Sequence, residues 1–169
     1  IYNFVNCTFE ECSASDSGGA LYCFTQKNIK ITVFECKFIS NQVTNKDEPN
    51  APSNSISSSK APSGGGGALY ASVANVNISN CEFRNNECKY GSNICLFPIL
   101  NNNNHLPIFN IDDCIFEFSN PSADGNSCSL FLKRMNGGTV KFNFRNNKFI
   151  GDAVDNTYHI INGSLTVTD

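Results

Sequence analysis

Val76-Asn77-Ile78-Ser79-Asn80-Cys81-Glu82-Phe83 is the stretch that decides the fold, because its pattern recurs five times in this 169-residue chain. Two apolar residues stand at alternate positions, a two-residue polar break follows, and then come a small residue, any residue and Phe. Such a repeat indicates a repeat architecture. The copies are Tyr2-x-Phe4 with Cys7-Thr8-Phe9, Ile31-x-Val33 with Cys36-Lys37-Phe38, Val76-x-Ile78 with Cys81-Glu82-Phe83, Phe109-x-Ile111 with Cys114-Ile115-Phe116, and Phe142-x-Phe144 with Asn147-Lys148-Phe149.

The polar break predicts a corner in the backbone. Side chains alternate between the two faces of a strand, so Val76 and Ile78 share a face while Cys81 and Phe83 have the opposite parity. A bend between the two half-strands lets both halves face one interior. Its second residue is Asn or Asp in four of the five copies, and these residue types tolerate the left-handed backbone region. The predicted bends are Val5-Asn6, Phe34-Glu35, Ser79-Asn80, Asp112-Asp113 and Arg145-Asn146.

A second landmark follows each copy and predicts a loop that leads into a third strand. The long interval between the second and third copies contains residues 42–63, rich in Ser, Asn, Pro and Lys, which we interpret as a looped-out insertion; residues 101–107 form a second one. The landmarks are Gly18-Gly19-Ala20-Leu21-Tyr22, Gly66-Gly67-Ala68-Leu69-Tyr70, Gly91-Ser92-Asn93-Ile94, Gly125-Asn126-Ser127-Cys128 and Asn156-Thr157-Tyr158.

Three short strands per unit, without the periodicity of an amphipathic helix, predict an all-β fold in which each unit is one rung of a parallel β-helix. Residues 1–169 then form a single segment of about five rungs. Equivalent residues stack at the strand spacing of about 4.8 Å, and burial of each Phe contributes about 1.5–3 kcal/mol. The expected core ladders are Phe9, Phe38, Phe83, Phe116 and Phe149, and Cys7, Cys36, Cys81 and Cys114.

The two landmarks together resemble a known family. The Gly-Gly-Ala-Leu-Tyr of 18–22 and 66–70, with Phe-x-x-Asn at 38–41 and 83–86, is similar to the repeats of polymorphic outer-membrane proteins, known from chlamydiae and from large surface proteins of some protists. The resemblance is strongest in residues 1–97, and the last two units lack Gly-Gly-Ala. It implies a right-handed, pectin-lyase-like parallel β-helix outside the cell or on its surface, with adhesive or structural duty. The family supplies no catalytic residues to carry over.

Both ends of the sequence have the pattern of a cut solenoid. The chain opens inside a repeat, and Leu165 and Val167 match the apolar pair of a further copy, with Asp169 at the corner position. We therefore expect a fragment of a longer solenoid. An exposed terminal rung leaves strand edges open to association, so the expected partners are host or cell-surface molecules or other copies of the chain.

Charge and hydropathy exclude two classes of partner. The net charge is −3 and charged residues make up 16% of the chain, with no basic cluster, so the electrostatic footprint of a nucleic-acid-binding protein is missing. No apolar run approaches eighteen residues, so no membrane span is predicted within this segment.

Nine cysteines indicate an oxidising compartment. The ladder cysteines are expected as stacked thiols or as bridges, and both alternatives remain open. Cys95 and Cys128 belong to adjacent predicted rungs and are a candidate pair. No Cys-x-x-Cys pair occurs, so neither a metal site nor a cofactor is predicted. The disulfide candidates are Cys12, Cys23, Cys88, Cys95 and Cys128, and the candidate glycosylation sites, each in an Asn-x-Ser/Thr sequon, are Asn6, Asn77 and Asn162.

The rival hypothesis is a polysaccharide-binding or polysaccharide-degrading enzyme of the pectin-lyase-like fold. Such chemistry needs clustered carboxylates on stacked strands. The adjacent acidic pair within a repeat is Asp112-Asp113, which we interpret as a corner. The sequence therefore predicts a β-solenoid without catalytic residues. Its role as an extracellular stalk or adhesin, able to polymerise, is what the resemblance implies.

Overall fold

The fold is built from parallel sheets without a helix in the described part of the chain. The structure, a computed structural model, describes residues 1–24, 29–44, 65–88, 91–97, 107–117, 130–133, 140–150, 158–161 and 164–168. The first sheet contains β1 (Tyr2–Val5), β5 (Lys30–Phe34), β9 (Asn75–Ser79), β12 (Ile108–Asp112), β15 (Lys141–Arg145) and β18 (Ser164–Thr168). The second contains β2 (Thr8–Glu10), β6 (Lys37–Ile39), β10 (Glu82–Arg84), β13 (Ile115–Glu117) and β16 (Lys148–Ile150). The third contains β4 (Leu21–Phe24), β8 (Leu69–Ser72), β11 (Ile94–Leu96), β14 (Leu130–Lys133) and β17 (Tyr158–Ile161), and a small sheet contains β3 (Ser13–Ala14) and β7 (Gln42–Val43).

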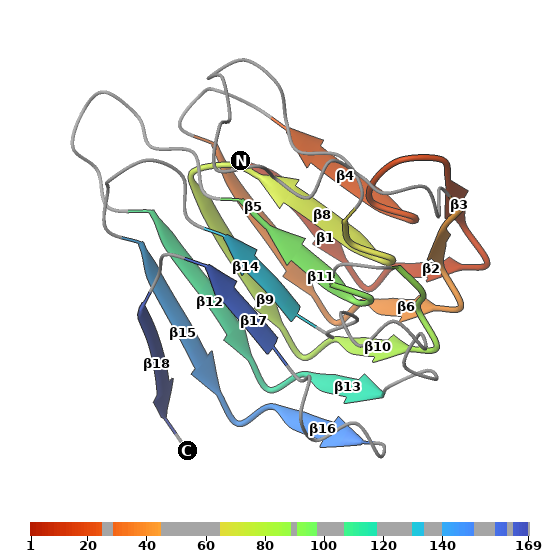
Figure 1. Cartoon of the computed structure of the whole chain (residues 1–169). Coiled ribbons are helices and arrows are strands. Elements are labelled where there is room, and N and C mark those ends of the chain that lie inside the picture. Colours follow the sequence, from red (N-terminus) through yellow and green to blue (C-terminus); the bar gives the residue numbers. More distant parts are fainter. Residues whose placement is uncertain are drawn as a thin grey trace, which may run out of the picture.

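Every pair of neighbouring strands runs parallel, and neighbours come from successive copies of the repeat. Along the chain, a strand of the first sheet is followed by one of the second and then by one of the third (Figure 1). The all-β, parallel arrangement predicted from the sequence is confirmed, and its order is consistent with a parallel β-helix.

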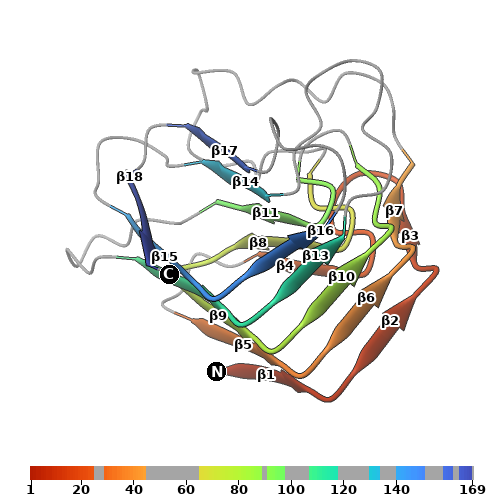
Figure 2. The ribbon, with the colours of Figure 1, turned by 90° about the horizontal axis from the view of Figure 1, so that it is seen from below.

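The corner between the first and second sheets lies where the polar break predicts it. Its five residues have φ of 53° or 54°, in the left-handed region, and are Asn6, Glu35, Asn80, Asp113 and Asn146. Each of the first four donates its N–H to the carbonyl just before the next corner, at 2.9 to 3.1 Å. Figure 2 shows the two sheets meeting along this line. The corner therefore explains the change of parity.

A second corner was not predicted. Glu11, Ser40 and Asn85 also have a φ of 53°, and they turn the chain at the end of β2, β6 and β10. The short strands β3 and β7 follow the first two of these turns. The expectation of three strands per unit was therefore incomplete. It was also wrong to begin the first insertion at residue 42, because Gln42 and Val43 form β7; residues 45–64 and 101–106 lie outside the described part.

The glycine landmark has two separate causes. Gly18, Gly66 and Gly91 have φ of 63°, 71° and 62°, a conformation that glycine adopts without strain. At the next position a Cβ on Gly19 would lie 2.1 Å from the carbonyl oxygen of Gly67. Two units therefore pack backbone against backbone there, which explains the doubled glycine.

The fourth landmark was misaligned. Gly125-Asn126-Ser127-Cys128 predicts that Cys128 is equivalent to Ile94, whereas Leu130 is the residue registered with Ile94. Residues 118–129 lie outside the described part. The strand is therefore offset by two residues from its expected place.

The interior contains a continuous stack of aromatic rings. Phe38, Phe83 and Phe116 are fully buried, and Phe149 at the end of the stack is 38% exposed. Successive ring centroids from Phe9 to Phe149 are separated by 4.9, 4.8, 5.0 and 5.2 Å with near-parallel planes. Stacking adds about 0.5–1.5 kcal/mol per pair to the burial of each ring. The structure thus brings together the five residues of the expected ladder, which are registered in β2, β6, β10, β13 and β16.

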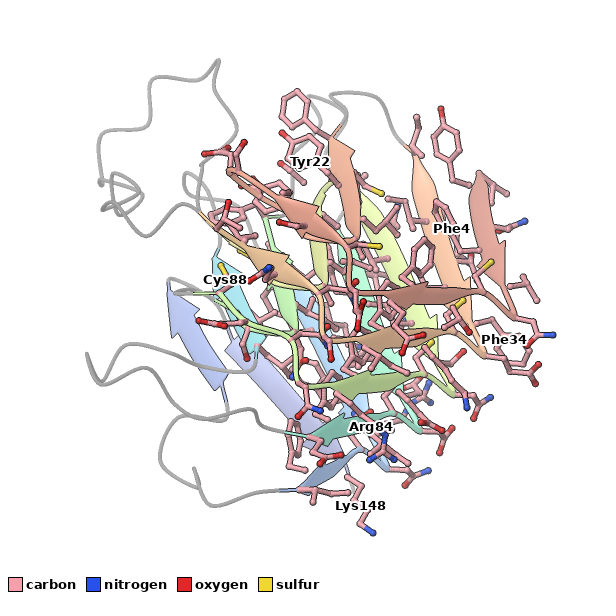
Figure 3. All side chains as sticks on the ribbon, turned by 90° about the vertical axis from the view of Figure 1, so that its right-hand side faces the viewer. Phe4, Tyr22, Phe34, Arg84, Cys88 and Lys148 are labelled. Atoms are coloured by element: carbon pink, nitrogen blue, oxygen red, sulfur yellow. The ribbon has the colours of Figure 1, made fainter. Side chains whose placement is uncertain are left out.

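Removing the central ring tests the contribution of this stack. Phe83→Ala is expected to lower the free energy of unfolding by about 3–5 kcal/mol, because it leaves a cavity between two stacked rings. Phe34→Ala, which removes a half-buried outward-facing ring, is the matched control and is expected to cost less than about 1 kcal/mol (Figure 3). Urea unfolding followed by circular dichroism measures both; equal losses would contradict the ladder.

Candidate functional site

The thiols of the cysteine ladder hold the first corner from inside. The N–H of Cys7 donates to the Sγ of Cys36 at 3.4 Å, and the N–H of Cys36 donates to the Sγ of Cys81 at the same distance. Each thiol from Cys7 to Cys114 donates to the carbonyl two residues earlier, at 3.2 to 3.3 Å. All four are free thiols. Of the two alternatives, stacked thiols or disulfide bridges, the ladder cysteines therefore form stacked thiols.

The fifth copy has Asn147 in place of cysteine, and its amide makes equivalent contacts. The N–H of Cys114 donates to Asn147 Oδ1 at 3.0 Å, and Asn147 Nδ2 donates to the carbonyl of Ile111 at 2.7 Å. Both residue types therefore supply hydrogen-bond partners for backbone groups at the corner. A buried backbone group left without such a partner would cost about 1–3 kcal/mol.

Burial and mutual contact shift the pKa values of three of these thiols, and not all in the same direction. The hydrogen bond with Cys81 and burial raise the pKa of Cys114, while the hydrogen bond from Cys114 lowers the pKa of Cys81. Burial raises the pKa of Cys36. Cys36, Cys81 and Cys114 are buried, so access to their thiols is limited, and their contacts support the corner.

The disulfide candidates do not gather at one place. Cys12 and Cys23 are half-buried free thiols after β2 and in β4. Cys88 and Cys95 are buried, and the residue registered with Cys95 is Phe131. Cys128 lies outside the described residues. The pairing of Cys95 with Cys128 stays a prediction.

Cys23 offers a test of the interior environment. Burial raises the pKa of its thiol to about 11, compared with about 8.5 for an unperturbed thiol. At pH 8 the folded protein should therefore contain about a hundredfold less Cys23 thiolate than the protein unfolded in urea. Alkylation with iodoacetamide, followed by mass spectrometry of the Cys23 peptide, should be slower by at least that factor in the folded state. Equal rates in both states would contradict this burial.

The asparagine side chains of the Phe-x-x-Asn motif form a buried hydrogen-bond network. The sequence analysis did not predict this structural role. Asn41 is fully buried and Asn86 is 1% exposed. The Nδ2 of each donates to a phenylalanine carbonyl of the preceding unit, Asn41 to Phe9 at 3.1 Å and Asn86 to Phe38 at 3.0 Å. Asn86 Oδ1 accepts from both the N–H and the Nδ2 of Asn41 at 3.0 Å. The repetition of Phe-x-x-Asn was the available signal.

The network extends beyond these two residues. The N–H of Cys12 donates to Asn41 Oδ1 at 3.0 Å, and Asn86 Nδ2 donates to Oδ1 of the buried Asn93 at 2.9 Å. The first unit has Cys12 at the position of the motif asparagine, so its backbone is held by the neighbouring unit instead. The amides therefore satisfy the backbone groups exposed by the second corner.

Adjacent asparagines allow a matched test of this network. Asn86→Leu is expected to lower the free energy of unfolding by about 2–4 kcal/mol, because the Asn41 N–H and the Phe38 carbonyl lose their partner. Asn85 is exposed with a positive φ, so Asn85→Gly should change stability by no more than about 0.5 kcal/mol. Thermal and urea unfolding measure both variants. Similar losses for the two would show that burial of the amide is unimportant.

The three sequons lie in different environments. Asn6 is an exposed corner residue whose N–H donates to the carbonyl of Phe34 at 2.9 Å. Asn77 is half-buried, on the outer face of the first sheet, and its side-chain amide lies 2.9 Å from that of Asn110. Asn162 lies outside the described residues. Attachment of a glycan at Asn77 would therefore break a side-chain contact, whereas Asn6 has none to lose in the described part of the protein.

The acidic residues considered for catalysis make contacts between strands. Asp112 accepts from Arg145 at 2.9 and 2.7 Å, and Asp113 accepts from Asn146 at 3.1 Å. On the outer face of the second sheet, Arg84 bridges Glu82 and Glu117 (Figure 3). The contacts of Arg84 with Glu117, Arg145 with Asp112 and Asn146 with Asp113 link neighbouring units, whereas Arg84 and Glu82 lie on the same strand.

Within the described residues, no group of three or more His, Cys, Asp or Glu side chains is placed to hold a metal ion. The same part of the chain contains no helix with the length and apolarity to cross a membrane. Comparison with known proteins found no matching family model, no matching curated protein and no matching solved structure.

Proposed function

We propose that the chain is a segment of a right-handed, pectin-lyase-like parallel β-helix of about five rungs, with looped-out insertions and further rungs in a longer solenoid. The observation that supports this proposal is the in-register pairing of like positions from successive repeats in all three large sheets. The segment serves as a non-enzymatic structural or adhesive element outside the cell or on its surface.

The chemistry of the charged groups supports a structural role. Asp112, Asp113 and Glu117, which a polysaccharide-cleaving site could have used, each contact a neighbouring unit. An acid that is engaged in this way stabilises the stack and is poorly placed to transfer a proton. The resemblance to polymorphic outer-membrane protein repeats and the sequons support an extracellular location.

The edge strands are open to further strands, whether from the same protein or from other copies. β1, β2 and β4 each have a hydrogen-bonded neighbour on one side within the described residues. Strand edges of this kind accept further strands, and burial of their apolar side chains would add about 25 cal/mol per Å². The large apolar side chains exposed on β1 and β4 are Tyr2 at 58%, Val5 at 53%, Tyr22 at 49% and Phe24 at 42%.

The location is tested on intact cells of the source organism. An antibody raised against the purified chain should label unpermeabilised cells, and protease treatment of those cells should remove the signal, because the proposed segment is displayed outside. A signal that requires permeabilisation would contradict the proposal.

Two measurements on the purified protein separate the parts of the proposal. Incubation with polyuronate or glycosaminoglycan polymers should release no oligosaccharides; release that is abolished by Asp112→Asn would favour the enzyme. Light scattering should reveal end-to-end multimers, and a strictly monomeric protein at high concentration would contradict the filament without affecting the surface role.

A further inference from the structure

The outer face of the first sheet contains a straight row of amide and hydroxyl side chains. One position on each strand is polar along the whole sheet, and its register is continuous from β1 to β18. The side chains of this row that lie on β5, β9, β12 and β15 are half-buried. The row consists of Asn3, Thr32, Asn77, Asn110 and Asn143, and Thr166 has the same register position on β18.

The amides of the row are held in line by contacts between strands. The side-chain amide of Asn143 lies 2.7 Å from that of Asn110, which lies 2.9 Å from that of Asn77. With its amide reversed so that the oxygen faces Lys30, Asn77 Oδ1 accepts from Lys30 Nζ at 3.0 Å, and the amides of Asn110 and Asn143 must be reversed with it so that donors still face acceptors along the row. An amide has two donors and two acceptor lone pairs, so each retains hydrogen-bonding capacity towards solvent. The result is a preorganised polar line that begins at an ammonium group.

A second row beside it adds positive charge. Lys30 and Lys141 occupy the same register position with Asn75 and Ile108 between them, and both lysines are exposed. They are separated by three strand spacings, about 14 Å. These two rows have no acidic residue on the strands that the structure describes, although the whole chain has a net charge of −3. Asp112, in the third outer row, is paired with Arg145. This face is thus locally cationic on an acidic protein.

We propose that this face binds a linear anionic polysaccharide that runs across the strands of the first sheet. Two lysines three strands apart suit repeated acidic groups on an extended polymer, and the amides of the neighbouring row suit its hydroxyl groups. Nucleic acid is a poorer match, because the two rows have no aromatic side chain in the described residues for base stacking and only two cations. The proposal gives the adhesive role a ligand class, and to that extent it rests on the proposed function.

Binding is tested on the purified chain with immobilised polymers in low salt. A linear polyuronate and a linear sulfated glycosaminoglycan are the two acidic probes, and a neutral linear glucan, single-stranded DNA and anionic lipid vesicles are the comparison probes. The protein should be retained by at least one acidic polysaccharide and not by the glucan, and which of the two retains it distinguishes carboxylate from sulfate. Retention by neither, or equal retention by the glucan, would overturn the proposal. Tighter binding to DNA or vesicles would also overturn it.

The second sheet provides a matched control for the charge. Lys37 and Lys148 occupy one register position on its outer face and are likewise three strands apart, with Glu82 between them. The double variant Lys30→Glu/Lys141→Glu should raise the dissociation constant for the acidic polymer by about tenfold or more. The double variant Lys37→Glu/Lys148→Glu should leave that constant within about twofold of its original value. Equal weakening by both double variants would show a general charge effect and contradict the assigned face.

The amide row is tested by shape-conserving substitutions. Asn110→Val should weaken binding by a few-fold, and Asn110→Thr, which restores the type of side chain found at Thr32, should recover part of it. Thermal unfolding verifies that each variant is folded. If the antibody labels the chain at the cell surface but no polymer retains the purified chain, only the ligand assignment fails. If it binds through Lys30 and Lys141 but is never displayed, the surface function fails instead.

Discussion

Each strand of the three large sheets is paired with the equivalent strand of a neighbouring repeat, and nearly everything else in the structure depends on that register. The pairing places Phe83 against two other phenylalanines, Cys36 against two other cysteines and Asn41 against Asn86. A slip of one residue would turn every inward side chain to the outside. The ring, thiol and amide ladders therefore stabilise one another, since each is in place only when the other two are.

The two corners make this register possible within a short unit. Each places a residue in the left-handed region, a conformation that costs a non-glycine residue of order 1–3 kcal/mol when it is poorly supported. Glu35 and Ser40 adopt it although neither is Asn, Asp or Gly. Their N–H groups donate to the carbonyls of Ser79 and Arg84 in the next unit, at 3.1 and 2.9 Å. Stacking thus supplies the support that the residue type does not.

The parts of the fold that were predictable from the sequence are those in which one residue type repeats at one position. Parity changed at the same place in all five copies, which located the first corner at positions such as Asn80. The second corner left a weaker signal, because Glu11, Ser40 and Asn85 share no residue type. The strand at Leu130 was misplaced because the Gly-Gly-Ala landmark is lost in that unit.

The candidate site was less predictable than the fold. The amide row on the outer face of the first sheet is visible as Asn77, Asn110 and Asn143 only once the register is known, since the sequence gives no reason to compare these positions for their outward side chains. The buried role of Asn86 likewise required the second corner to be recognised.

A crystal structure of the chain is the most direct test of the in-register stack. The account predicts β6, β10 and β13 side by side and parallel, with the rings of Phe38, Phe83 and Phe116 stacked at centroid separations of 4.8 and 5.0 Å. Antiparallel hairpins, or a map in which these three rings lie apart from one another, would contradict it.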